Sequence, residues 1–154
     1  DTKFKLKENQ ILINILIKDK ILCSNAVSIG IRRGDYVNLK SVICDVDYYK
    51  KAINLINKKI DNPVYYIFSD DIEWCRRNIT FSNKHFFVEA NKDTPFENMQ
   101  LMSLCKHNII SNSTYDWWGA FLNKNKQKIV ICSKAWKPKE SKKMKLIPNE
   151  WIKI

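Results

Sequence analysis

Three short clusters of arginine, carboxylate and hydroxyl residues are the candidates for chemistry in this sequence. Each follows a short apolar run, and they are Arg32-Arg33-Gly34-Asp35, Ser69-Asp70-Asp71 and Ser111-Asn112-Ser113-Thr114. A planar guanidinium binds a pyrophosphate through parallel hydrogen bonds and stabilises the charge of a departing nucleoside diphosphate. Carboxylates accept the N–H donors of guanine, and hydroxyls at a helix start add donors for phosphate. These residue types together predict a nucleotide site.

The arginines are notable because 23 of the 27 basic residues are lysine. The four arginines form two adjacent pairs, Arg32-Arg33 and Arg76-Arg77. Adjacent residues at the end of a strand point to opposite sides, so we expect one residue of the first pair to face a ligand and the other to face the scaffold. A surface ion pair with Asp35 is the alternative for this pair. We interpret Arg76-Arg77 as a solvated helix end.

The two other clusters each have a structural alternative. Asp70 and Asp71 suit Mg²⁺, guanine, or the N-cap of a helix that begins at Ile72. Ser113 and Thr114 suit either phosphate binding or simple capping of the next helix, since Ser and Thr favour that position. Asp116 in the first turn is expected to compete for the free N–H groups of that helix.

Short apolar runs alternate with amphipathic segments along the chain, which predicts β-α-β units and a doubly wound parallel α/β sheet. The expected strands are 26–31, 64–68, 85–88, 108–110 and 129–132. The expected helices are 7–17, 47–60, 71–77, 95–106 and 113–122. Thr94 is expected to cap the fourth of these helices, with Pro95 at its first position. Ligands bind at the carboxyl ends of such strands, where all three clusters fall.

Composition narrows the class of protein. The chain has 154 residues, 45% of them hydrophobic, which is enough to bury a core, and we treat residues 1–154 as one domain with residues 1–20 as a leading helix. No apolar run approaches the length of a membrane span. The five cysteines form no C-x-x-C pair, so neither zinc nor a disulfide framework is indicated and a reducing cytoplasm is expected. The motifs of dinucleotide-binding proteins and P-loop NTPases are absent.

The net charge of +11 leaves other partners open. A basic domain that binds nucleic acid is the less favoured alternative, and an anionic membrane surface is a further candidate partner. His85 and His107 lie outside the three clusters and are interpreted as structural. The pair Trp117-Trp118 is interpreted as helix packing.

Three blocks resemble the α-1,2-fucosyltransferase family. The segment 27–37 resembles its H-x-R-R-x-D motif, which related α-1,6 and protein O-fucosyltransferases share. The segment 68–75 resembles its F-S-D-D-x-x-W block, and 110–120 resembles its S-N-S-T-[FY]-S-W-W-[GA]-A block. The ending 147–152 resembles the family's usual close, so the resemblance runs from about Lys7 to the C-terminus.

The resemblance implies a Rossmann-like donor-binding domain of a GT-B transferase that moves L-fucose, with inversion, from GDP-fucose to the 2-hydroxyl of a galactose-type acceptor. No cofactor and no metal are implied. Arg32 would hold the pyrophosphate and stabilise departing GDP, and Asp70 or Asp71 would bind guanine. The implied donor-binding set is Arg32, Arg33, Asp35, Asp70, Asp71, Ser111, Asn112, Ser113 and Thr114, with Arg32 also catalytic.

The chain departs from the family pattern at two positions: Gly30 stands where the family has His, and Asp116 stands where it usually has Ser. A degenerate GDP-sugar-binding module is therefore an alternative, and Gly30→His would tighten GDP binding if the site had decayed. The family's glycine-rich N-terminal block is also absent, so the chain resembles a C-terminal half whose partner is an N-terminal acceptor domain. The implied context is surface-glycan or lipopolysaccharide synthesis, in the cytoplasm or at the inner membrane face.

Overall fold

Six parallel strands form one sheet in the computed structural model, which describes residues 2–38, 44–89, 94–136 and 146–154, with side chains from residue 11 onward. The strands are β1 (Asn25–Ile31), β2 (Pro63–Ser69), β3 (His85–Glu89), β4 (His107–Ile109), β5 (Val130–Cys132) and β6 (Ile152–Lys153). Their order is β3-β2-β1-β4-β5-β6. This order belongs to doubly wound nucleotide-binding folds, so the predicted fold class is confirmed.

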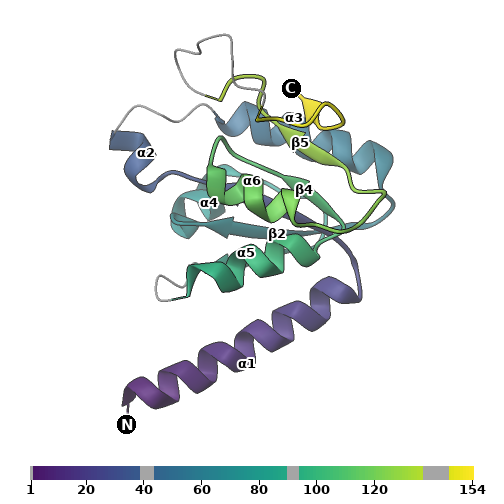
Figure 1. The fold of residues 1–154 in the computed structure, drawn as a ribbon. Coiled ribbons are helices and arrows are strands. Elements are labelled where there is room, and N and C mark those ends of the chain that lie inside the picture. Colours follow the sequence, from purple (N-terminus) through teal and green to yellow (C-terminus); the bar gives the residue numbers. More distant parts are fainter. Residues whose placement is uncertain (1, 39–43, 90–93, 137–145) are drawn as a thin grey trace.

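Helices cover both faces of the sheet (Figure 1). They are α1 (Thr2–Leu22), α2 (Gly34–Asn38), α3 (Val46–Lys59), α4 (Ile72–Asn78), α5 (Pro95–Leu104) and α6 (Thr114–Phe121). Residues of α3 and α4 share one hydrophobic cluster with the sheet, and residues of α1 and α5 share another. A third cluster joins α6 to the β4 end, β5 and the C-terminal Trp151, which packs back as predicted.

The central strand β1 is buried on both faces, as its apolar run requires. Its alternation places Val27, Ile29 and Ile31 in the cluster with α3 and α4. Ala26 lies in the cluster with α1 and α5, and Gly30 belongs to the same set of alternate positions. Gly30 lies on the side of β1 that faces α6, because a Cβ atom at this position would meet Asp116 of that helix.

Two buried tyrosines of α3 fix the carboxyl ends of the strands. The Tyr48 hydroxyl donates to the Ile110 carbonyl at 2.6 Å, and the Tyr49 hydroxyl donates to the Gly30 carbonyl at 3.1 Å. Burial raises the pKa of both hydroxyls well above the ordinary value, so both stay protonated donors. Side chains from a neighbouring helix thus hold the end of β1, at Gly30, and the residue just after β4, Ile110.

Several elements differ from the expected ones. Gly34 and Asp35 begin the short helix α2, which the expected helices do not include, and only two residues separate it from β1. Thr94 is the N-cap residue of α5 and Pro95 starts the helix, as predicted, but the Thr94 side chain makes no capping hydrogen bond. Helix α5 ends at Leu104 rather than residue 106, and the short strand β6 was not anticipated.

Helix α1 contacts the body along one side only. Ile21 is buried and Ile17 packs beside it, and Asn14 donates a hydrogen bond to the Glu97 carboxylate of α5. Ile11, Leu12, Ile15 and Leu16 are each about half exposed. Among the described helices, none combines the length and apolar composition that crossing a bilayer requires.

Candidate functional site

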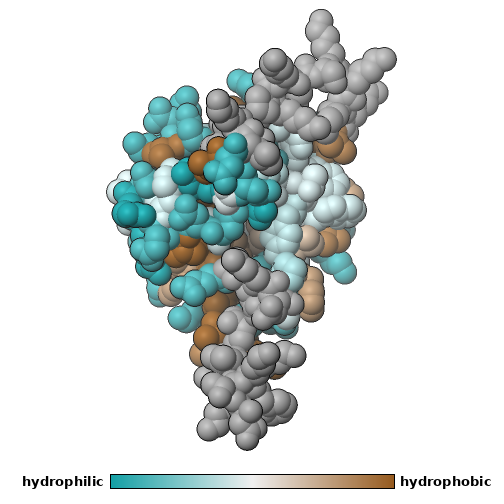
Figure 2. Space-filling model, turned by 90° about the vertical axis from the view of Figure 1, so that its left-hand side faces the viewer, coloured by the Kyte–Doolittle hydropathy of each residue, from teal (hydrophilic) through white to brown (hydrophobic). Residues whose placement is uncertain are grey.

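A cleft of about 1050 Å³ opens at the carboxyl edge of the sheet, between the ends of β1 and β2 and the start of α6. This is the size range of pockets that hold nucleotides and similar ligands. Figure 2 views the molecule from this side and shows mainly hydrophilic residues around it. The predicted residues that line it are Arg32, Asp35, Asp70, Asp71, Ser113 and Thr114. The sheet thus brings together residues up to 82 positions apart, as expected for strand ends in a parallel sheet.

Arg32 presents its guanidinium to the cleft between two carboxylates. Its Nη2 lies 3.0 Å from Asp35 Oδ1, and its Nε lies 3.3 Å from Asp70 Oδ2. The side chain is 41% exposed, so these ion pairs are solvated and cost little to rearrange. The pairs orient the guanidinium and leave it accessible to a ligand that enters the cleft. Arg32 therefore forms the ion pair with Asp35 that was the alternative from sequence, and it also lines the cleft.

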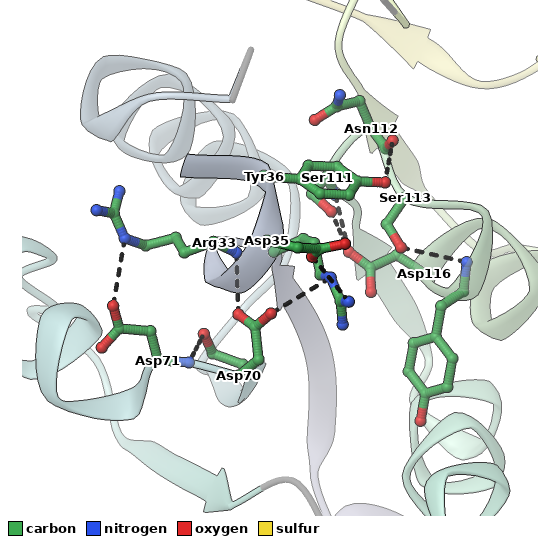
Figure 3. Close-up of polar contacts among 12 residues, drawn as sticks. Arg33, Asp35, Tyr36, Asp70, Asp71, Ser111, Asn112, Ser113 and Asp116 are labelled. Atoms are coloured by element: carbon green, nitrogen blue, oxygen red, sulfur yellow. Dashed lines mark hydrogen bonds and ion pairs between the residues drawn. The ribbon is translucent and has the colours of Figure 1, made fainter. Parts of the chain in front are cut away.

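Arg33 points away from the cleft, as Figure 3 shows. Its guanidinium stacks over the Trp74 ring at 3.8 Å and its Nε lies 3.6 Å from Asp71 Oδ2. This arrangement confirms the expectation that the two adjacent arginines face opposite sides. The contacts of Arg33 tie the end of β1 to helix α4, so we expect Arg33 to support the scaffold rather than touch a nucleotide.

Asp70 links the β1 and β2 ends. Its Oδ1 accepts the Arg33 backbone N–H at 2.9 Å while its Oδ2 faces Arg32. A Cβ atom at Gly34 would lie 2.6 Å from Asp70 Oδ2, so glycine is needed there for the close approach of α2. Asp71 caps α4 by accepting the Trp74 N–H at 3.1 Å, which confirms the capping alternative for this residue.

The start of α6 forms the opposite wall of the cleft. Ser113 is the N-cap and accepts the Tyr115 N–H at 3.2 Å, and the exposed Thr114 is the first helical residue. The positive end of the helix dipole therefore faces the cleft. Ser111 and Asn112 do not line it: Asn112 is buried and donates to the Trp136 carbonyl at 3.2 Å. The expected nucleotide contacts of these two side chains are thus not supported by their position.

Asp116 behaves differently from the expectation. Its carboxylate does not cap α6 or compete for the N–H groups of that helix; it accepts both the backbone N–H of Ser111, at 3.1 Å, and the Ser111 hydroxyl, at 2.5 Å. Figure 3 shows it turned toward Ser111, and the residue is 5% exposed although it lines the cleft. Burial of the carboxyl raises its pKa to about 6.

The two departures from the family pattern touch each other. A Cβ atom at Gly30 would lie 2.2 Å from Asp116 Oδ2 and 2.6 Å from its Oδ1. Gly30 has no left-handed φ, so its lack of a side chain is required by space and not by backbone conformation. The single substitution Gly30→His therefore requires Asp116 to move, and its expected effect on GDP binding stays a prediction.

The raised pKa of Asp116 makes its contribution to stability depend on pH. The carboxyl has a pKa of about 6 when folded against 3.8 ordinarily, so ionisation costs more in the folded state. Stability is lost as pH rises from about 4 through 6 and stays reduced above that, by up to about 3 kcal/mol. Arg32 opposes this shift and Asp70 adds to it. We expect Asp116→Asn to raise the free energy of unfolding at pH 8 and to leave it unchanged at pH 4, as measured by urea denaturation.

The matched control for that prediction is Asp61→Asn, since Asp61 is exposed beyond α3 at the opposite edge of the sheet. Asp61→Asn should change the free energy of unfolding little, because this side chain is exposed. An equal effect of Asp116→Asn at pH 4 and at pH 8 would contradict the role of ionisation.

The cleft is acidic within a basic protein. The described residues around it supply one guanidinium, that of Arg32, and six carboxylates, those of Asp35, Asp70, Asp71, Glu73, Glu89 and Asp116. Such a wall offers many acceptors for N–H and O–H groups and few cations for a polyanion. Within the described residues no cluster of three or more His, Cys, Asp or Glu side chains has the arrangement of a metal site.

The cleft is also lined by residues that no sequence pattern indicated, among them Tyr36, Glu89, Asn98 and Tyr115. The Tyr36 hydroxyl donates to the Asn112 carbonyl at 3.4 Å and so bridges α2 to the loop before α6.

The histidines and the tryptophan pair lie outside the cleft. His85 stacks on Phe81 and His107 accepts the Ile129 N–H, which confirms that both histidines are structural. Trp117 packs on Phe121 and against Trp151, which confirms the packing role predicted for it.

Comparison with known proteins gives a consistent result. Residues 6–154 match the model of glycosyl transferase family 11. The chain is 38% identical to an Escherichia coli O-antigen biosynthesis glycosyltransferase WbnK over 95% of this chain and 52% of that protein. It is also 38% identical to an E. coli alpha-1,2-colitosyltransferase, over 99% of this chain and 57% of that protein. A mouse galactoside 2-alpha-L-fucosyltransferase Sec1 is 33% identical over 64% of this chain and 29% of that protein. No solved structure matches the chain significantly.

Proposed function

The chain belongs to glycosyl transferase family 11, and from that premise we propose that it is the part of an inverting α-1,2-glycosyltransferase that binds the GDP-sugar donor. The chain spans about half the length of the two E. coli relatives, at 52% and 57%. The transfer activity of a whole enzyme is therefore proposed for the longer protein that such relatives represent, and not for this chain alone. The observation that carries it is the convergence of Arg32 and the start of α6 on one cleft at the carboxyl edge of the sheet.

The diphosphate of the donor fits between these two groups. The Arg32 guanidinium supplies a planar pair of charged donors, and the N-terminal turn of α6 supplies backbone N–H groups and the Thr114 hydroxyl. When the sugar leaves, negative charge increases on the β-phosphate, and a guanidinium placed there stabilises that charge. No step of this kind requires a metal ion, so the proposal includes none.

The acidic residues of the cleft fit the rest of a nucleotide sugar. Guanine presents two N–H groups on one edge, which a carboxylate of the cleft wall can accept as a pair. Ribose and sugar hydroxyls donate to the remaining carboxylates. A nucleic acid, by contrast, would bring a repeating polyanion against six carboxylates, so the charge of the cleft disfavours that alternative.

The acceptor and the setting follow from the relatives by analogy. The sugar is L-fucose or colitose, the acceptor is the 2-hydroxyl of a galactose-type glycan, and the product belongs to a surface glycan such as O-antigen. The acceptor site lies in an additional domain, and the half-exposed apolar residues of α1 are available to pack against it. The cytoplasm, with the basic surface near an anionic membrane, is the proposed location. We expect the 154-residue chain alone to bind GDP and to transfer little or no sugar.

Calorimetric titration of the purified chain with GDP, GDP-fucose, UDP and ADP at moderate salt tests the proposal. Binding of the two guanine nucleotides, with UDP and ADP at least tenfold weaker, is the expected result. Equal weak binding of all four that disappears with added salt would support the charge-driven alternative. Failure to bind any of them would mean that the cleft is not a working donor site.

A further inference from the structure

Gly30 and Asp116 form a single structural unit, in which Asp116 lines the cleft and Gly30 lies directly behind it in β1. They lie 86 positions apart, yet the Asp116 carboxylate fills the space in which a side chain at position 30 would stand. A larger residue at position 30 excludes this orientation of Asp116, and glycine permits it. The polar group on this part of the cleft therefore comes from α6 in this chain and not from β1.

The Asp116 carboxylate is costly to keep there. It is buried, its pKa is raised to about 6, and above that pH the folded protein holds an ion in a poorly solvated position. Its hydrogen bonds to Ser111 use an acceptor that a neutral side chain such as Asn would also supply. The packing of α6 thus does not require a charge at this position, so a ligand contact is the remaining use for it.

An ionised carboxylate accepts hydrogen bonds and donates none, which limits what it can contact. Phosphate oxygens are also acceptors and carry like charge, so the diphosphate belongs next to Arg32 and Thr114. A sugar hydroxyl is a donor and matches the carboxylate. Other acidic side chains of the cleft, such as Asp35 and Asp71, lie on the opposite wall near the β1 and β2 ends and are far more exposed than Asp116.

We propose that Asp116, whose carboxylate occupies the space that Gly30 leaves open, is a specificity-determining residue that accepts a hydrogen bond from a hydroxyl of the donated sugar. This inference rests on the proposed function, because it requires a nucleotide-sugar donor in the cleft. It makes sugar recognition depend on α6 and diphosphate recognition depend on Arg32, so that the two can be separated by substitution.

The experiment measures the affinities of GDP and GDP-fucose for the parent chain and for Asp116→Ala at pH 8. Loss of a hydrogen bond to a charged group weakens binding by about 10- to 100-fold. We expect Asp116→Ala to lower the affinity for GDP-fucose by at least tenfold. The affinity for GDP should stay equal or rise, because one repelling charge is gone. Asp116→Ser is the second variant if the first folds poorly, and Asp61→Ala is the control that removes a charge at the far edge of the sheet.

Deoxy analogues of GDP-fucose identify the hydroxyl. One analogue should bind the parent chain at least tenfold more weakly than GDP-fucose and show no further loss with Asp116→Ala, as a double-mutant cycle requires for a direct contact. Equal changes for GDP and GDP-fucose, or additive losses for every analogue, would overturn the inference. Absence of GDP binding by the parent chain would instead refute the proposed function, so the two failures are distinct.

Discussion

Arg32→Ala is expected to lower GDP affinity by about 100-fold or more, since it removes a bidentate pair of charged hydrogen bonds to the diphosphate. The substitution also leaves the carboxylates of Asp35 and Asp70 without their cation, and both then repel the phosphates. Arg32→Lys retains the charge but not the planar fork, so we expect an intermediate loss of about tenfold. Calorimetric titration with GDP gives the affinity of the parent chain and of both variants.

Two other arginines provide the controls. Arg77 is exposed on α4 and bonds only within its own helix, so Arg77→Ala should leave GDP affinity unchanged. Arg33→Ala should lower the free energy of unfolding, because the guanidinium stacks on Trp74, and should affect GDP affinity far less than Arg32→Ala. A larger effect on GDP binding from Arg33 than from Arg32 would contradict the assignment of the two side chains.

Gly30→Ala is expected to destabilise the protein by about 2–3 kcal/mol, the cost of forcing one methyl group into a packed interior. The added Cβ atom would lie 2.2 Å from Asp116 Oδ2, and β1 is too deeply buried to move aside. The double variant Gly30→Ala/Asp116→Ala removes the obstructing carboxylate. It should be little less stable than Asp116→Ala alone, so the two substitutions should be strongly non-additive.

Urea denaturation of the four chains measures this coupling. Gly119→Ala is a useful comparison, because a Cβ atom there would lie 3.0 Å from Met102 Cβ and would crowd a residue other than Asp116. A Gly30→Ala effect that is the same with and without Asp116 would show that the glycine is needed for some other reason.

The fold was largely predictable because the sheet is buried on both faces, so its strands appear as continuous apolar runs such as 26–31 and 64–68. Alternation of these runs with helices then determines a parallel sheet and places the strand ends at one edge. Thr94 shows the limit of local patterns: its sequence context is that of an N-cap, yet the side chain makes no such bond. Boundaries of short elements such as α2 depend on tertiary contacts that no local pattern encodes.

The site was predictable only in part. The positions of Arg32, Asp70 and Asp71 directly after strands predicted their place in the cleft. Arg33 and Asn112 also come after strands, but their side chains point elsewhere. Which side chain turns into the cleft depends on contacts with distant residues such as Trp74 and Trp136. The contact between Gly30 and Asp116 joins β1 to α6, which are distant in the sequence, and each residue alone gave a misleading interpretation.

The most direct test of the central claim is to map GDP binding onto the backbone by NMR, using the ¹⁵N-labelled chain of 18.2 kDa. The account predicts that GDP shifts the amide signals of residues 32–34, 69–71 and 113–116, which surround the cleft, and that Arg32→Ala abolishes these shifts. Shifts concentrated at the opposite edge of the sheet, near residues 24–25, 61–63 and 105–106, would contradict it. So would the absence of any shift at millimolar GDP.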